Sequence, residues 1–91
     1  MIKQAEIIVS GKVQGVFFRA RTKNKADGLK VVGRVENLSD GTVKILAQGE
    51  QKDIEQLIGW CRHGAVVAKV DRVEVKWIET SAEFKDFKII Y

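Results

Sequence analysis

Apolar and polar residues alternate along several short stretches of the chain, and this two-residue period predicts strands with one buried face. In the first stretch Ala5, Ile7 and Val9 share a face, with mostly polar residues between them. In chain order, we expect strands at residues 5–10, 31–38, 42–48, around 73–77, and at 87–91. Residues 37–41 are typical turn residues and predict a hairpin between the second and third strands, with Asp40 stabilising the turn.

Two other stretches have the period of an α-helix. The first helix is expected from Phe18 to about Leu29, on a thin apolar stripe at positions 18, 22, 26 and 29. Because the stripe is thin, this helix must depend on tertiary packing. The second, over residues 52–63, is the clearer amphipathic helix, and Gly64 is placed to cap its C-terminus. Its apolar positions are Ile54, Leu57, Ile58 and Cys61.

The order of elements is therefore strand, helix, strand, strand, helix, strand, with a short strand at the C-terminal end. Right-handed crossovers turn this order into one antiparallel sheet with both helices on one face. The predicted fold is an α+β, ferredoxin-like two-layer sandwich. No linker, repeat or low-complexity segment interrupts the pattern, so residues 1–91 are expected to form a single domain.

Composition narrows the class of protein. Apolar residues make up 45% of the chain and charged residues 31%, which is typical of a soluble globular protein. No apolar run is long enough for a signal peptide or a membrane span, so we expect a cytoplasmic protein without membrane contact. A single cysteine, Cys61, and a single histidine, His63, exclude a disulfide framework and predict neither metal nor cofactor. The net charge of +4 suits an anionic small molecule or a nucleic acid without choosing between them.

The loop between the first strand and the first helix is a candidate anion-binding site. Residues 10–19 follow the first strand, contain Gly11 and Gly15, and lead into the first helix with Arg19 at its start. Backbone N–H groups in such a loop, together with the helix dipole, favour an anion, and a guanidinium can bind two phosphate oxygens at once. The alternative is a turn whose glycines only relieve strain and whose arginine is solvated.

Two segments of the chain resemble the signatures of the acylphosphatase family. Residues 11–19 resemble the first signature, residues 33–43 resemble the second, and Gly49 stands at the expected later position. The spacing from Arg19 to Asn37 and the order of elements over nearly the whole chain agree with the family as well.

This resemblance implies metal-free hydrolysis of the carboxyl–phosphate bond of acyl phosphates to a carboxylate and inorganic phosphate. It implies two catalytic residues: Arg19 would neutralise the phosphate and Asn37 would orient the attacking water. The substrate is a small acyl phosphate, inorganic phosphate or sulfate would bind as a product-like ligand, and the protein would be a monomer without a nucleic-acid partner. The implied phosphate-binding residues are Gln14, Gly15, Val16, Phe17, Phe18 and Arg19.

Several positions depart from the family pattern, although none of them removes a catalytic group. They concern the surface that faces the substrate and the end of the first helix. Arg34 stands where the family usually has an aromatic residue, Glu36 where it has a basic or neutral residue, and Phe17 where glycine is frequent. The first helix usually ends in Leu-Gly, but here Lys30 follows Leu29 and the glycine comes earlier, as Gly28. After the second helix, Ala65 follows Gly64 where the family usually has proline.

Other residues admit two interpretations each. His63 could be a general base, but its place at the end of the second helix favours a solvated or helix-capping role. Cys61 continues the apolar stripe and fits the core better than a nucleophile. Glu36 could act beside Asn37 or be a solvated carboxylate. Trp60 and Trp77 are expected to pack, and the basic residues are expected to be solvated or to attract anionic substrates: Arg21, Lys23, Lys25, Lys30 and Arg34.

Three other functions stay open at this point. A ferredoxin-like domain can bind RNA on the open face of its sheet, but that mode needs exposed aromatic residues, and residues 42–48 have none. The chain could also resemble the acylphosphatase-like domain of a larger carbamoyl-transfer maturation protein. Finally, it could be a relic of the fold without activity.

Overall fold

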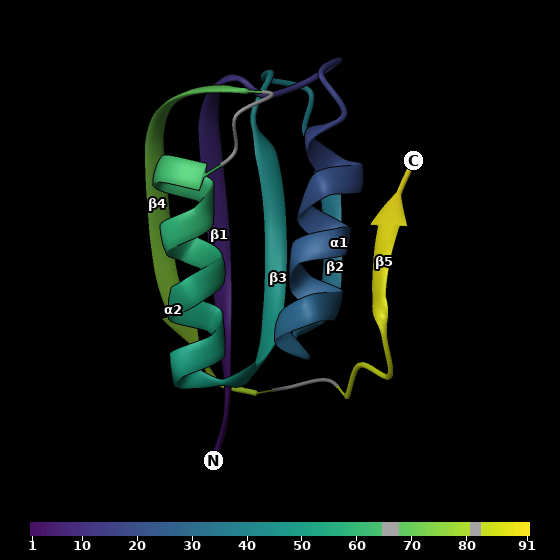
Figure 1. The fold of residues 1–91 in the computed structure, drawn as a ribbon, viewed down its shortest axis with the longest axis vertical. Coiled ribbons are helices and arrows are strands. Elements are labelled where there is room, and N and C mark those ends of the chain that lie inside the picture. The colour runs from purple at the N-terminus through teal and green to yellow at the C-terminus, as the bar shows by residue number, and fades with distance from the viewer. Residues whose placement is uncertain (65–67, 81–82) are drawn as a thin grey trace.

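The computed structural model describes residues 1–64, 68–80 and 83–91. Along this part of the chain the elements follow the predicted order (Figure 1). They are β1 (Ile2–Lys12), α1 (Phe18–Leu29), β2 (Val32–Asn37), β3 (Val43–Glu50), α2 (Gln51–Gly59), the π-helical turn η1 (Trp60–Gly64), β4 (Lys69–Ile78) and β5 (Phe87–Ile90).

The strands form one sheet in the order β4-β1-β3-β2-β5. The first four strands pair with one another in antiparallel fashion, as predicted. The last strand differs, because β5 pairs with β2 in parallel, with Val35 opposite Ile89. In Figure 1 the chain leaves β4 at one edge of the sheet and rises through β5 at the other edge, starting from the end where β2 also starts. The sheet is therefore mixed, within the ferredoxin-like arrangement that the sequence predicts.

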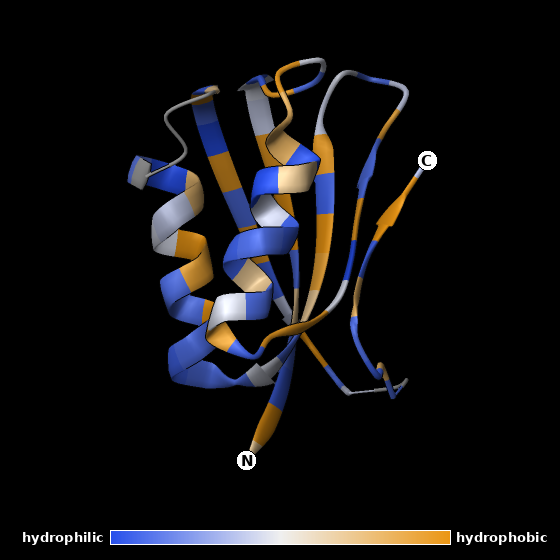
Figure 2. Cartoon of the chain, turned by 45° about the vertical axis from the view of Figure 1, so that its right-hand side comes forward, coloured by the Kyte–Doolittle hydropathy of each residue, from blue (hydrophilic) through white to orange (hydrophobic). Residues whose placement is uncertain are grey.

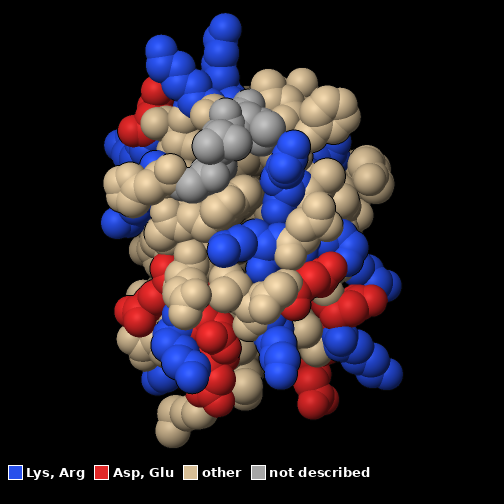
Figure 3. Space-filling model, viewed as in Figure 1, with Lys and Arg blue, Asp and Glu red and all other residues tan. Residues whose placement is uncertain are grey.

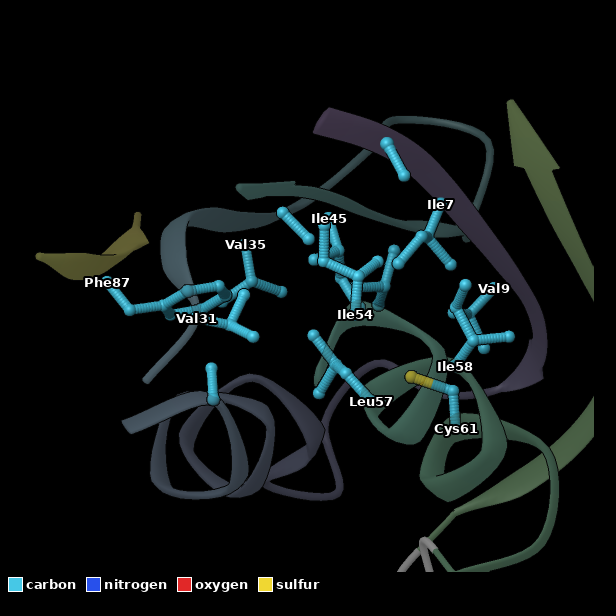
Figure 4. Packing of buried hydrophobic residues seen from close by; sticks show 14 of the residues in the cluster. Ile7, Val9, Val31, Val35, Ile45, Ile54, Leu57, Ile58, Cys61 and Phe87 are labelled. Atoms are coloured by element: carbon cyan, nitrogen blue, oxygen red, sulfur yellow. The ribbon is translucent and has the colours of Figure 1, made fainter. Parts of the chain in front are cut away.

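Both helices cover the same face of the sheet, and the core lies between the two layers (Figure 1). Hydrophobic and hydrophilic residues alternate along the strands in Figure 2, as the sequence pattern requires. In β1 the predicted inner residues Ala5, Ile7 and Val9 are fully buried. Figure 4 shows strand and helix side chains, among them Ile45 and Leu57, pointing toward one another between the layers.

The first helix has the predicted bounds, but it ends in an unexpected way. Gly28 stays inside the helix, and Lys30 adopts the left-handed conformation, with φ 60°. The N–H of Lys30 donates to the carbonyl of Asp27 and the N–H of Val31 donates to the carbonyl of Ala26, which is the Schellman pattern. A lysine therefore fills the position that glycine usually takes, at a cost of about 1–2 kcal/mol.

The second helix is shorter than predicted as an α-helix. It is α-helical only to Gly59, and residues 60–64 continue as the π-helical turn η1. The structure describes this helical stretch up to Gly64, and the cap predicted there involves residues outside the described ranges. Within η1 the ring of Trp60 stacks on Phe18, with the ring centroids 5.6 Å apart, and Cys61 is fully buried. Trp60 and Cys61 thus pack as predicted, whereas Trp77 on β4 is 44% exposed and is not a core residue.

The hairpin between β2 and β3 forms where the sequence predicts it. The Asp40 carboxylate accepts hydrogen bonds from the N–H of Thr42 at 3.0 Å and from its hydroxyl at 2.6 Å, which lowers the pKa of Asp40. At the start of β2, Gly33 has φ 139°, and a Cβ there would collide with the carbonyl oxygen of Leu46. Only glycine lets β2 approach β3 this closely. Among the described residues no helix is long and apolar enough to cross a bilayer.

Candidate functional site

A cavity of about 330 Å³ opens where the β1–α1 loop, the end of β2 and the end of β5 meet. Arg19 and Asn37, which lie 18 positions apart in the sequence, both line this cavity. The structure therefore brings together the two residues that the resemblance singles out. The full lining is Val13, Gly15, Phe17, Phe18, Arg19, Ala20, Asn37, Ile89 and Tyr91.

The backbone of the loop takes two left-handed positions just before the helix. Gly15 has φ 74° and Phe17 has φ 63°, whereas Val16 between them does not have a positive φ. Where left-handed and right-handed residues alternate, successive N–H groups turn to one side and can form a concave anion-binding surface. Glycine adopts such a φ freely, whereas a bulky residue such as Phe17 adopts it at a cost of about 1–3 kcal/mol.

The N-terminus of α1 carries no acceptor of its own. Its first intrahelical bond runs from the N–H of Arg21 to the carbonyl of Phe17, at 3.0 Å. The N–H groups of the preceding helical residues have no intrahelical partner, which is a general property of helix starts. No side chain of the described residues caps this end, and no acidic residue lies in the first turn. The positive end of the helix dipole is thus left for an external anion.

Gln14 ties the loop to the neighbouring hairpin. Its side-chain amide donates to the carbonyl oxygen of Leu38 at 2.8 Å and to that of Thr42 at 2.9 Å. These two bonds use both amide protons. The Gln14 side chain therefore points to the hairpin that follows Asn37, and any contact of Gln14 with an anion falls to its backbone.

Arg19 is held by the C-terminal end of the chain. Its Nη1 donates to the carbonyl oxygen of Ile90 at 3.0 Å, and its guanidinium lies 4.9 Å from the centre of the Tyr91 ring. No carboxylate of the described residues forms an ion pair with Arg19. Since a guanidinium has five N–H donors, most of them stay available to an anion in the cavity.

Asn37 is the last residue of β2, and its side-chain oxygen is unusual. Oδ1 is buried, and no described residue donates a hydrogen bond to it. A buried acceptor without a donor costs about 1–3 kcal/mol. Buried polar atoms in proteins nearly always have a protein or water partner, and Asn37 itself lines the cavity.

Tyr91 and Ile89 line this cavity, although the sequence pattern does not predict it. The sequence indicates only a short alternating strand at residues 87–91. Their place in the cavity depends on the parallel pairing of β5 with β2, which sets Ile89 opposite Val35 and the chain end near Asn37. The pattern of one strand gives no signal for which edge of the sheet it joins.

The other candidates lie away from this cavity. Burial raises the pKa of the Cys61 thiol to about 12, so the thiol stays protonated and is a core group, as predicted. His63 lines a separate groove between α2 and β4, beside Trp77. Glu36 pairs with Lys44 in the register of β2 and β3 and points to the face opposite Asn37, because successive strand residues alternate.

Neither the charges on the helix-bearing face nor the metal-binding side chains of the described residues indicate a second site. Figure 3 shows basic and acidic side chains interspersed over the helix-bearing face, without one large patch of a single sign. Within the described ranges no three His, Cys, Asp or Glu side chains gather to hold a metal ion.

Comparison with known proteins identifies clear relatives. The acylphosphatase family model matches residues 5–89. An acylphosphatase of Pelotomaculum thermopropionicum is 42% identical over 88 residues, which cover 97% of this chain and 96% of that protein. The crystal structure of acylphosphatase from Bacillus subtilis superposes with a TM-score of 0.92 at 35% identity, and covers 100% of both chains. A full-length HypF, solved in a phosphate- and nucleotide-bound form, matches all of this chain with 12% of its own length, at 32% identity and a TM-score of 0.89.

Proposed function

The chain belongs to the acylphosphatase family and hydrolyses acyl phosphates, and we propose that the reaction takes place in the cavity lined by Arg19 and Asn37. The observation that carries this proposal is the buried Asn37 Oδ1, which has no donor among the described residues and belongs to the same cavity as the Arg19 guanidinium. One residue offers positive charge and the other offers an unfilled acceptor, so the cavity supplies both groups that the hydrolysis needs.

The phosphate would bind at the start of α1. The backbone N–H groups of residues 14–19 and the helix dipole would surround it, and Arg19 would pair with its oxygens. In phosphoryl transfer the charge spreads over the equatorial oxygens of a loose transition state, so donors fixed in advance are more useful than a strong base. Each well-aimed donor contributes on the order of 3 kcal/mol to the transition state. The leaving group is a carboxylate, which departs without a proton.

The attacking water would donate a hydrogen bond to Asn37 Oδ1. This contact fixes the water beside the phosphorus and removes part of the entropy barrier. An amide oxygen is not basic enough to take the proton, so Asn37 acts by orientation. The proton passes to the substrate phosphate or to bulk water as the oxygen–phosphorus bond forms and the carboxylate leaves.

An assay of the purified chain with an aryl acyl phosphate in the presence of a chelator tests this mechanism. We expect unchanged turnover, because the loop N–H groups and Arg19 supply all the positive charge that the proposal requires. Loss of turnover on chelation, with recovery on adding a divalent metal, would contradict it. Inorganic phosphate and sulfate should inhibit competitively, since each would occupy the same loop.

We also propose that the protein acts as a cytoplasmic monomer. A single buried cysteine fits a reducing compartment, where disulfides do not form. The open face of the sheet does not favour the RNA-binding alternative, because its β1 and β3 positions carry no aromatic residue in the described chain. These positions are Gln4, Glu6, Ile8, Ser10, Lys44, Leu46 and Gln48.

A further inference from the structure

A second cavity lies at the opposite end of the sheet from the one that Arg19 and Asn37 line. Its volume is about 660 Å³, and the two cavities share no lining residue of the described chain. It lies at the lower end of Figure 1, where β1 begins, α1 ends and the chain crosses from β4 toward β5. The residues that form it include Ile2, Lys30, Val32, Gln48, Glu83 and Phe84.

We propose that this cavity binds a small zwitterion with an apolar side group, of the chemical class of a free aromatic amino acid. Lys30 pairs with its carboxylate, Glu83 pairs with its ammonium group, and the apolar lining covers its side group. The inference goes beyond the proposed function and does not depend on it, because neither charged residue lines the cavity of Arg19.

Lys30 and Glu83 carry opposite charges at one cavity, yet they do not pair with each other. In the part of the chain that the structure describes, no carboxylate forms an ion pair with Lys30 and no cation forms one with Glu83. Both residues are exposed, so each charge is accessible to a ligand. A ligand with one charge leaves the other residue unpaired, whereas a zwitterion meets both. Each exposed pair of this kind contributes up to about fivefold in affinity.

The backbone of Lys30 has a conformation that favours glycine. Its φ of 60° lies in the left-handed region, at the helix end where glycine is the usual residue. A lysine is strained there, and its exposed side chain buries little surface in return. Strain at a residue that lines a cavity without supporting the core indicates a role toward a ligand.

The rest of the cavity wall is held in place and partly apolar. Gln48 is 4% exposed. Its Oε1 accepts a hydrogen bond from the N–H of Phe84 at 3.3 Å, and its Nε2 donates to Oε1 of Gln4 at 3.3 Å. These bonds tie the segment after β4 to β3, so Phe84 stands beside the sheet. Ile2 and Val32 are not fully buried, and an apolar group that covers them leaves water, which is favourable.

The test is a titration of the isotope-labelled chain with L-phenylalanine, followed by NMR. N-acetyl-L-phenylalanine keeps only the carboxylate, and L-phenylalaninamide keeps only the ammonium group. We expect L-phenylalanine to bind at least about threefold more tightly than either derivative, and to shift amide signals at the start of β1 and the end of β3. A smaller difference, or no shift at this end of the sheet, would overturn the inference.

Substitutions of the two charges separate their roles. In Glu83→Gln the dissociation constant of L-phenylalanine should rise about threefold or more, and that of the N-acetyl derivative should not change, because the derivative carries no ammonium group. Lys30→Gln should weaken the binding of both. Lys25→Gln, which removes an exposed charge from the middle of α1, should weaken neither. Natural affinity for L-phenylalanine in Lys30→Gln would show that the inference is wrong.

Lys30→Gly separates a loss of binding from a loss of folding. Glycine adopts the left-handed φ freely, so the unfolding midpoint in denaturant should rise while L-phenylalanine binds at least about threefold more weakly. Undiminished binding in this variant would contradict the role of Lys30.

Inorganic phosphate distinguishes the two cavities. Saturating phosphate should leave the binding of L-phenylalanine unchanged, since the proposed phosphate site lies at the start of α1. Displacement by phosphate would place L-phenylalanine in the cavity of Arg19 and would overturn this inference alone. Natural turnover in Arg19→Ala would overturn the proposed function and leave the zwitterion site standing.

Discussion

The two helices of this protein begin in opposite ways. The first turn of α2 carries Asp53, a negative charge of the chain itself, and the residue before it, Glu50, has an extended backbone. The first turn of α1 carries no acidic residue, and Phe17 before it is left-handed. Both helix starts have the same dipole and the same unpaired N–H groups. At α2 an internal carboxylate offsets them, whereas at α1 no acidic residue of the first turn does so, as the proposed phosphate site requires.

The surroundings of the two helix starts also differ, because only α1 begins at the cavity that Arg19 and Asn37 line. α1 begins in the cavity that also holds Arg19 and the unfilled oxygen of Asn37. α2 follows directly on β3, without a loop between them. Under the proposed function, the start of α1 binds phosphate because the chain places no counter-charge in its first turn and has a cavity in front of it. The variants below alter one of these features at a time, from the largest expected effect to the smallest.

Removal of the positive charge at α1 should have the largest effect. In Arg19→Ala we expect kcat/KM to fall about 10³-fold or more, since a guanidinium on a transferring phosphoryl group contributes on that scale. Phosphate inhibition should weaken in the same variant. Lys25→Ala, which removes an exposed charge on the same helix, serves as the control and should retain activity. Steady-state kinetics with near-natural rates for Arg19→Ala would contradict the account.

An added negative charge would make the start of α1 resemble that of α2. Ala20 is exposed in the first turn of α1 and lines the cavity. In Ala20→Glu we expect the inhibition constant of phosphate to rise about tenfold, because the new carboxylate offsets the dipole that the phosphate would use. Ala20→Gln has the same size without the charge. Equal inhibition constants for the two variants would show that charge at this helix start does not matter.

Loss of the two Gln14 hydrogen bonds between the β1–α1 loop and the β2–β3 hairpin should lower both stability and turnover. Gln14→Ala removes two donors from the carbonyls of Leu38 and Thr42 and should lower the free energy of unfolding by about 1–2 kcal/mol. Turnover should fall several-fold, since Asn37 and the loop are then less firmly placed relative to each other. Denaturant unfolding and kinetics on the same sample separate the two effects. If Gln14→Ala has natural stability, the two hydrogen bonds do not hold the loop.

Removal of the internal counter-charge at α2 should have the smallest effect. In Asp53→Asn we expect the free energy of unfolding to fall by about 0.3–1 kcal/mol, the usual contribution of a carboxylate to a helix start. Activity and phosphate inhibition should not change, because Asp53 is not among the residues that line the cavity. A weakened phosphate inhibition in this variant would mean that the two helix starts are not independent.

The sequence predicts the layers of this fold better than their edges. Periodicity alone places the inner face of β1 and both ends of α1, because burial of one face imposes a regular spacing. Periodicity does not place β5, because the alternation of residues within one strand does not show which edge of the sheet the strand joins. The parallel pairing of β5 with β2 therefore cannot be predicted from this pattern. For the same reason Tyr91 was not expected in the site.

The candidate site is predicted mainly by the resemblance to family signatures, and only in part by the chemistry of its residues. The glycines and Arg19 indicate an anion-binding loop, whereas Asn37 enters only through the resemblance of residues 33–43 to a family signature. The left-handed φ of Phe17 and of Lys30 could not be foreseen, because both positions carry residues that rarely adopt it. The π-helical turn after Gly59 is likewise a result of packing.

The most direct test of the account is the separation of water placement from phosphate binding in Asn37→Ala, with Asn24→Ala on the exposed side of α1 as the control. We expect kcat to fall about 10²-fold in Asn37→Ala while the inhibition constant of inorganic phosphate stays within about threefold of the natural value. Full turnover in this variant, or an equal loss of turnover and phosphate binding, would contradict the proposal that Arg19 and the loop hold the phosphate while Asn37 places the water.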